Sequence, residues 1–178
     1  MCKLAAYARS QQKKTLFIFC NDCSCMQKLI PQENFIVCTA LGTFLNAQNG
    51  FDTTFFKHYV EQEGVKQIIL VGHYPCKVLD FLLQDGTDSP HWADAKQYMR
   101  QLKQSFEALT FDATLNWEKF IHYHIATQVQ NLSRFSFFRK RTGEAAISIK
   151  GIVIEENNSL EVVETDHLEA ILLPINLN

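Results

Sequence analysis

The ten residues QIILVGHYPC, at positions 67–76, run from an apolar segment directly into a histidine and a cysteine. A short apolar run rich in β-branched residues predicts a buried strand. Two earlier runs have the same character, KTLFIFC at 14–20 and NFIVCTA at 34–40. Between the second and third runs, apolar residues recur at helical spacing over 43–63, before Gly64. The succession of strand, helix and strand predicts a parallel sheet with right-handed crossovers.

The second half of the chain adds helices and a hairpin. Helical spacing predicts helices over residues 80–83, 91–109 and 116–134. Two β-type runs, at 145–155 and 159–164, flank a pair of asparagines and predict a hairpin. We therefore expect a single α/β domain over residues 1–178, with a mainly parallel central sheet of about four to five strands flanked by helices.

Composition and charge narrow the classes of function. Hydrophobic residues make up 47% of the 178 residues and charged residues 20%, which is ordinary for a globular protein. A net charge of −2 gives no general attraction to polyanions, so we expect no nucleic-acid partner. The basic and aromatic segment RFSFFRKR at 134–141 is interpreted as a helix end or a dimer contact. No apolar segment reaches the roughly 18 residues of a membrane span, and the N-terminus lacks the apolar core of a secretory signal. We expect a cytoplasmic protein with no membrane partner.

The cysteines gather near the ends of predicted strands. Three of the six lie in CNDCSC at 20–25, and in a reducing compartment such clustering indicates metal or thiol chemistry. Cys20 ends the first predicted strand, and His73 and Cys76 follow the third. Open α/β sheets place ligand sites at the carboxyl ends of their strands, so these three side chains can converge. Two thiolates and one imidazole suit Zn²⁺ and leave a fourth tetrahedral position free.

Structural explanations of the same residues stay open. A histidine and a cysteine at a strand end are often packing residues, and Cys20 with Cys23 has the CxxC spacing of a redox pair. Cys38 lies at the end of the second predicted strand. It is interpreted either as a small buried side chain or as a residue at the edge of the presumed metal pocket. His122 and His124 are two residues apart, so they face different directions on the predicted helix and are interpreted as surface or packing residues.

The two motifs together resemble those of the β-class carbonic anhydrases, whose pattern is CxDxR after the first strand and GHxxCG after a later strand. The chain has Cys20-Asn21-Asp22 and, after the run EGVKQIILV, Gly72-His73-Tyr74-Pro75-Cys76. Fainter similarity continues in NFIVCTALGT, HIATQVQNL and ISIKGIVIEE. The resemblance covers most of the chain.

This resemblance implies an activity and the residues that perform it. Cys20, His73 and Cys76 are implied as ligands of Zn²⁺, and Asp22 as the catalytic residue that accepts a hydrogen bond from the zinc-bound hydroxide. In the family, that hydroxide attacks carbon dioxide to give bicarbonate. The resemblance also implies a homodimer.

The chain departs from the family pattern at the implied site. Ser24 replaces the arginine of CxDxR, Lys77 replaces the glycine after the second motif, and CTALG at 38–42 stands where the family has an RNAG-like stretch. Without the arginine, Asp22 is a candidate fourth zinc ligand, which predicts impaired hydration. Two rival hypotheses concern the site: Arg100, Arg134 or Arg139 takes the place of the missing arginine, or Cys23 or Cys25 approaches the metal. Two others concern the function: the chain is an inactive homologue with a structural or regulatory zinc site, or it is a related hydrolase of another small linear substrate.

Overall fold

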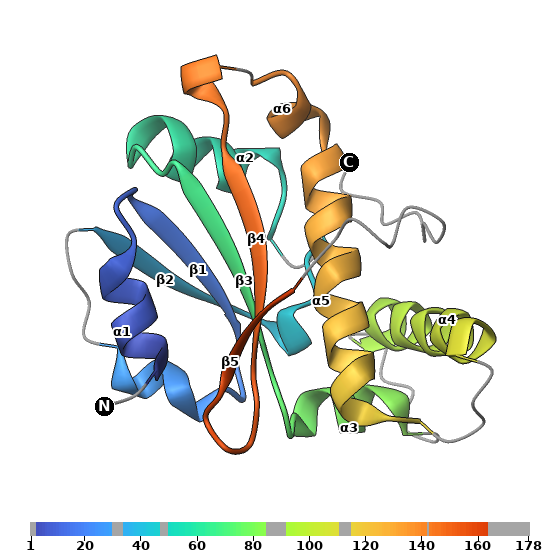
Figure 1. Ribbon diagram of the computed structural model, residues 1–178. Helices are drawn as coiled ribbons and strands as arrows, with labels where there is room; N and C mark the ends of the chain where they lie inside the picture. Colours follow the sequence, from blue (N-terminus) through green and yellow to red (C-terminus); the bar gives the residue numbers. More distant parts are fainter. Residues whose placement is uncertain are drawn as a thin grey trace.

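The computed structural model describes residues 3–29, 34–46, 50–84, 92–110, 115–141 and 143–163. Its centre is a five-stranded sheet in the order β2-β1-β3-β4-β5 (Figure 1). The strands are β1 (Thr15–Cys20), β2 (Phe35–Ala40), β3 (Gln67–His73), β4 (Ser148–Ile154) and β5 (Leu160–Val163). The first four run parallel, and β5 pairs antiparallel with β4. The expected α/β class with a mainly parallel sheet is confirmed.

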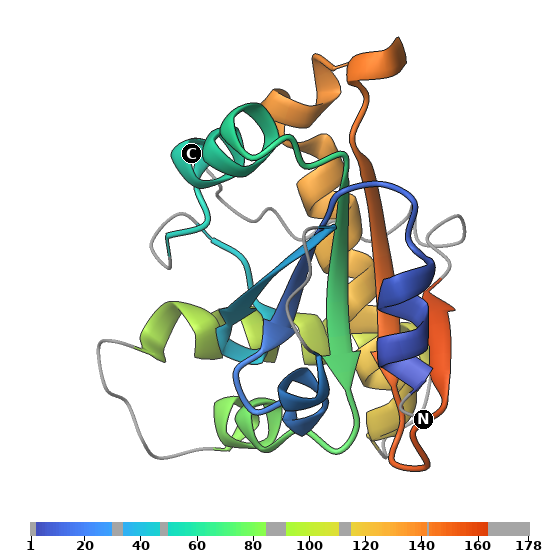
Figure 2. The ribbon, with the colours of Figure 1, turned by 90° about the vertical axis from the view of Figure 1, so that its left-hand side faces the viewer.

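Helices and short turns surround the sheet. The helices are α1 (Lys3–Ser10), α2 (Thr53–Lys57), α3 (Lys77–Leu83), α4 (Ala93–Thr110), α5 (Trp117–Arg134) and α6 (Ser136–Arg139). The short turns in the described part of the chain are η1 (Ser24–Lys28), η2 (Leu41–Thr43) and η6 (Gly143–Ala145), of 3₁₀ type, and η4 (His58–Gln62), of π type. Figure 2 shows α1 on one side of the strands and α2 and α4 on the other. In the described part of the chain, no helix combines the length and apolar character of a membrane span.

β1 and β3 form the centre of the sheet, and every residue of both strands is buried. Parallel strands covered on both faces need apolar residues on both faces, which explains why TLFIFC and QIILV show no alternation of apolar and polar residues. β1 lies between β2 and β3, and Phe19 pairs with Thr39 on one side and with Val71 on the other. The carboxyl ends of β1 and β3 therefore lie side by side, at the lower edge of the sheet in Figure 1, where α3 also lies.

α5 lies close against β3 and β4. Asn116 caps its first turn, because the side-chain oxygen accepts a hydrogen bond from the main-chain N–H of Lys119 at 3.1 Å. Glycines on both strands allow the close approach. A Cβ atom added at Gly72 or at Gly151 would lie 2.6 Å from a side-chain carbon of Ile125, which is too short for a real contact. The glycines of β3 and β4 thus determine how closely α5 packs against the sheet.

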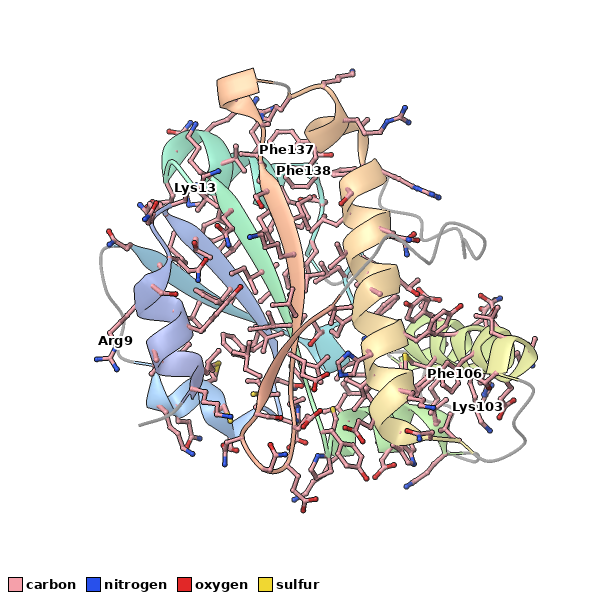
Figure 3. The ribbon with its side chains drawn as sticks, viewed as in Figure 1. Arg9, Lys13, Lys103, Phe106, Phe137 and Phe138 are labelled. Atoms are coloured by element: carbon pink, nitrogen blue, oxygen red, sulfur yellow. The ribbon has the colours of Figure 1, made fainter. Side chains whose placement is uncertain are left out.

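The segment 134–141 lies at the opposite end of the molecule from α3, around α6 (Figure 3). Phe138 is buried, and its ring packs against that of Phe56 with 5.2 Å between the centroids. Arg141 lies over the ring of Phe137 at 4.0 Å. The segment is therefore a helix end that is exposed at its basic residues Arg134, Arg139 and Lys140, while its phenylalanines contribute to packing.

The helix expected over residues 43–63 is wrong in its first half. The chain forms the short turn η2 at residues 41–43, and α2 begins only at Thr53 before it continues into η4. The cause is local, because the side chain of Asp52 accepts a hydrogen bond from the main-chain N–H of Phe55 at 2.9 Å and so caps a new helix. Gly50, with φ +81°, also adopts a conformation outside the helical region. Residues 47–49 lie outside the described part of the chain.

Other boundaries differ less from expectation. α3 begins at Lys77 rather than at residue 80, directly after Cys76, and α4 covers Ala93–Thr110 where 91–109 was expected. The hairpin is confirmed: Asn158 has φ +61° in the turn between β4 and β5, and residue 164 lies outside the described residues. α1 was not predicted. Its sequence, KLAAYARS, buries only Leu4 and Ala8, so its apolar periodicity is weak.

Candidate metal centre

The two motifs meet at the carboxyl edge of the sheet. Cys20 is the last residue of β1 and His73 the last residue of β3, so the adjacent parallel strands bring them to one edge. Cys76 follows three residues later, as the residue that precedes α3. The ligand atoms of these three side chains all lie within 4.8 Å of one another. The predicted convergence is confirmed, and the three form a group that could hold a metal ion.

Burial and missing hydrogen bonds fit a metal ion at this group. Cys20 and Cys76 are 1% and 5% exposed, and their Sγ atoms are 3.6 Å apart. Two thiolates on a tetrahedral zinc ion, with bonds of about 2.3 Å, stand about 3.8 Å apart. His73 is 9% exposed, and its Nε2 atom is buried with no hydrogen-bond partner among the described residues. Buried ring nitrogens normally have partners, so this one calls for a ligand.

Electrostatics within the group also favour a cation. The hydrogen bond from Cys76 lowers the pKa of the Cys20 thiol to about 5, because it outweighs the burial that acts in the opposite direction; His73 contributes in the same sense as Cys76. The Cys20 sulfur and burial raise the pKa of Cys76. The pair therefore favours one thiolate and one thiol over two thiolates. A divalent cation resolves this conflict, since it binds both sulfurs as thiolates.

Asp22 lies beside the group and is anchored at two points. Its main-chain N–H donates to the Sγ atom of Cys20 at 3.4 Å, and its side-chain Oδ2 accepts a hydrogen bond from the main-chain N–H of Lys77 at 2.9 Å. Among the described residues, the ligand atoms that lie within 4.8 Å of one another come from the two cysteines and the histidine, without Asp22. Ser24, where the family has arginine, is exposed.

Two of the arginines named as possible compensation, and the two further cysteines, lie outside the group. Arg134 ends α5 and Arg139 ends α6, at the edge of the sheet opposite to α3 (Figure 1). Cys23 and Cys25 are buried, and neither belongs to the metal-competent groups of the described residues. Burial raises the pKa of the Cys23 thiol to about 12, which makes it a poor nucleophile and a poor redox partner at neutral pH.

Cys38 is partly exposed and lines a cavity of about 620 Å³. Its thiol donates to the hydroxyl oxygen of Tyr59 at 3.4 Å, and burial raises its pKa. The wall of the cavity is mostly apolar, with Val37, Phe51 and Phe55 among its residues. None of Cys20, His73 and Cys76 lines this cavity, so it gives no support to the interpretation of Cys38 as part of the edge of the metal site.

A buried polar network escaped the sequence analysis. His124 is 0% exposed, and its Nε2 atom lies 2.7 Å from the carbonyl oxygen of Gly42, while its Nδ1 atom lies 3.5 Å from the hydroxyl of Tyr98. Gln128 donates to the same hydroxyl at 2.8 Å and accepts from the main-chain N–H of Leu45 at 3.1 Å. Burial lowers the pKa of His124 to about 4. The only sequence signal is the spacing of His124 and Gln128, two polar residues four apart on an otherwise buried helix face.

A second group of possible ligands lies at the surface. It comprises His122, Glu155 and Glu161, and the Nε2 atom of His122 lies 3.6 Å from a carboxylate oxygen of Glu161. His122 thus faces solvent while His124 is buried, as their spacing on the helix predicts. Solvated acidic groups of this kind are common without a bound ion, so we assign no metal to this surface group.

Comparison with known proteins gives one family. A family model described as carbonic anhydrase matches residues 15–160. A carbonic anhydrase of Synechococcus elongatus is 24% identical over 175 residues; the match covers 89% of this chain, which spans 63% of that relative.

Solved structures show the same fold. A β-carbonic anhydrase of Aspergillus fumigatus matches with a TM-score of 0.73 and 16% identity, over 93% of this chain and 82% of that one. One of two tetrameric β-carbonic anhydrases from Sordaria macrospora matches with a TM-score of 0.67 and 18% identity, over 90% and 85% of the two chains. At such identities, the likeness concerns the fold alone.

Proposed function

Because the chain belongs to the β-carbonic anhydrase family, we propose that it is a zinc enzyme that hydrates carbon dioxide reversibly to bicarbonate. We propose Cys20, His73 and Cys76 as the zinc ligands. The observation that carries the proposal is their convergence within 4.8 Å, with the Nε2 atom of His73 buried and unpartnered. A bound zinc ion supplies a nucleophile near neutral pH, because it lowers the pKa of a coordinated water.

The three side chains suit this task in charge and in surroundings. Two thiolates neutralise the dication, and the imidazole adds a neutral donor, as in known zinc sites with two cysteines and one histidine. All three are buried at the end of the apolar strands β1 and β3, which limits the access of bulk water. Electrostatic interactions are stronger in such surroundings than in water.

Asp22 is proposed as the catalytic carboxylate beside the metal. Its Oδ2 atom is already engaged by the main-chain N–H of Lys77. The other oxygen remains to accept a hydrogen bond from the reacting water and so to orient it. This arrangement favours an orienting role for Asp22 over the alternative role of a fourth zinc ligand.

The proposal is tested by stopped-flow measurement of carbon dioxide hydration with zinc-loaded protein, between about pH 7 and 9. We expect one zinc ion per chain and a hydration rate above that of the chelator-treated protein. Zinc bound at one per chain without hydration would contradict the enzymatic proposal. Thermal unfolding before and after chelation then tells whether the ion is structural, because a structural ion contributes directly to folding.

We also propose that the chain forms a homodimer. Support comes from the family resemblance and from the tetramers of the Sordaria macrospora enzymes, since closed tetramers are commonly built from symmetric dimers. Light scattering coupled to size-exclusion chromatography measures the mass directly. A monomeric mass at micromolar concentration would contradict the proposal.

A further inference from the structure

The hydrogen bond between Asp22 and Lys77 joins the two motifs of the site. Asp22 stands two residues after Cys20, and Lys77 follows Cys76 immediately, so the bond links segments 55 residues apart. Lys77 is the first residue of α3. The first N–H groups of a helix have no carbonyl partner within it. The donor that meets Asp22 is therefore one that the helix itself leaves free.

We propose that the main-chain N–H of Lys77 is the positioning group for the Asp22 carboxylate, at a site where Ser24 replaces the arginine of the CxDxR pattern. This inference rests on the proposed function. The amide holds the carboxylate by Oδ2, which would leave the second oxygen to accept a hydrogen bond from a water held at the metal-competent group. The loss of the guanidinium at Ser24 is thereby compensated by a backbone group.

The geometry supports a firm anchor. The donor–acceptor distance of 2.9 Å lies at the upper end of the range for charge-assisted hydrogen bonds. The main-chain N–H of Asp22 donates to the Cys20 sulfur at 3.4 Å, so the residue is held from both its backbone and its side chain. A main-chain donor, unlike an arginine side chain, has no rotamers to lose. Position 77 needs only an N–H group, which explains why lysine can stand where the family pattern has glycine.

The donor can be removed without disturbing the helix. Proline is favoured at the first position of a helix, because that N–H has no partner in the helix. The preceding residue must then be extended, and Cys76 already is, with φ −129° and ψ 107°. Lys77→Pro therefore deletes the hydrogen bond to Asp22 while it keeps the backbone path. Lys77→Ala is the matched control, since it removes the same side chain and retains the N–H.

We expect Lys77→Pro to lower the hydration rate roughly 10- to 100-fold at full zinc content, as for loss of one hydrogen bond to a charged group. Lys77→Ala should stay within about twofold of the unmodified protein. Adding Ser24→Arg to Lys77→Pro should recover about tenfold, because a guanidinium can then take over the carboxylate. Equal rates for the proline and alanine variants at equal zinc content would overturn the inference, as would a failure of Ser24→Arg to rescue.

A second measurement is independent of activity and of the folding of the proline variant. In the unmodified protein, nuclear magnetic resonance should place the Lys77 amide proton at low field, as for a donor to a carboxylate. In Asp22→Ala the signal should move to high field, while Ser24→Ala leaves it in place. An unmoved Lys77 signal in Asp22→Ala would show that the hydrogen bond is absent. This readout separates the inference from the proposed function, because it holds or fails whether or not the protein hydrates carbon dioxide.

Discussion

Two buried histidines, His73 and His124, have different roles in this fold. His73, at the carboxyl end of β3, lies beside two thiols and has an Nε2 atom with no hydrogen-bond partner among the described residues. His124, in the middle of α5, has one ring nitrogen at 2.7 Å from the Gly42 carbonyl and the other at 3.5 Å from the Tyr98 hydroxyl.

The difference shows that neighbours, not residue type, assign the role of a buried histidine. His124 is satisfied by the protein and holds the turn η2 against α5, so it is a structural residue. The Nε2 atom of His73 has no such partner among the described residues, and its two sulfur neighbours favour a soft divalent cation. Changing each histidine should therefore affect different properties of the protein.

The largest effect is expected at the metal-competent group. Cys20→Ser and His73→Ala should each lose the zinc ion and lower the hydration rate by about 10³-fold, because the ion contributes several kcal/mol of stabilisation to the transition state. Metal analysis and stopped-flow kinetics measure the two effects. His124→Asn should retain one zinc ion per chain; loss of zinc from this variant as well would erase the distinction between the two histidines.

The next effect is a pH dependence carried by His124. Its pKa is about 4 in the folded protein against an ordinary value of 6.5, so between these pH values the unfolded chain binds a proton that the folded chain does not. Stability is therefore full above the ordinary value and falls as the pH is lowered, by about 3 kcal/mol at pH 4.

Urea unfolding of the unmodified protein and of His124→Asn at a series of pH values isolates this contribution. The variant should be less stable near neutral pH by about 1–3 kcal/mol, since it leaves buried polar groups without partners. The unfolding free energy of the variant should also lack the fall at acid pH that His124 causes in the unmodified protein. Parallel curves for the two proteins would contradict the assignment of a buried neutral imidazole.

A smaller effect is expected where the two histidine regions touch. Gly72 precedes His73 and Ile125 follows His124, and a Cβ atom at Gly72 would lie 2.6 Å from the Ile125 side chain. Gly72→Ala should cost about 1–3 kcal/mol of unfolding free energy by overpacking. The double variant Gly72→Ala/Ile125→Ala should lose less unfolding free energy than the sum of the losses in the two single variants, because the smaller side chain at position 125 makes room for the added methyl group. If the losses of unfolding free energy measured in urea were additive, the contact between Gly72 and Ile125 would not determine the packing of α5 against the sheet.

The smallest effect is expected at Cys38. Cys38→Ser should keep the zinc ion and change the unfolding free energy by less than about 1 kcal/mol, because its thiol is partly exposed and stands apart from the metal-competent group. It is the matched control for Cys20→Ser, as the same substitution at a second strand. Loss of zinc from Cys38→Ser would mean that thiols outside the group contribute to binding.

The sequence predicts the parts of the fold that depend on local apolar runs. β1 and β3 are continuous apolar segments, and their pairing follows from the order strand, helix, strand. The convergence of Cys20, His73 and Cys76 follows in turn, because parallel neighbours end at one edge. The turn at Asn158 is equally local, since asparagine tolerates positive φ.

Features that depend on single distant contacts could not be predicted. The start of α2 is set by the cap at Asp52, which competes with an apolar spacing that continues across it. The donor to Asp22 is a backbone N–H, and a backbone group leaves no mark in the sequence. The partners of His124 come from α4 and from η2, so its burial was visible only as one polar residue on an apolar helix face.

X-ray absorption at the zinc edge of the metal-loaded protein tests the central claim most directly. We predict two sulfur neighbours at about 2.3 Å and two nitrogen or oxygen neighbours at about 2.0–2.1 Å, with the same shell in Cys38→Ser and no zinc ion retained by Cys20→Ser. A first shell without sulfur, or one unchanged in Cys20→Ser, would contradict the assignment of Cys20, His73 and Cys76 as the metal centre.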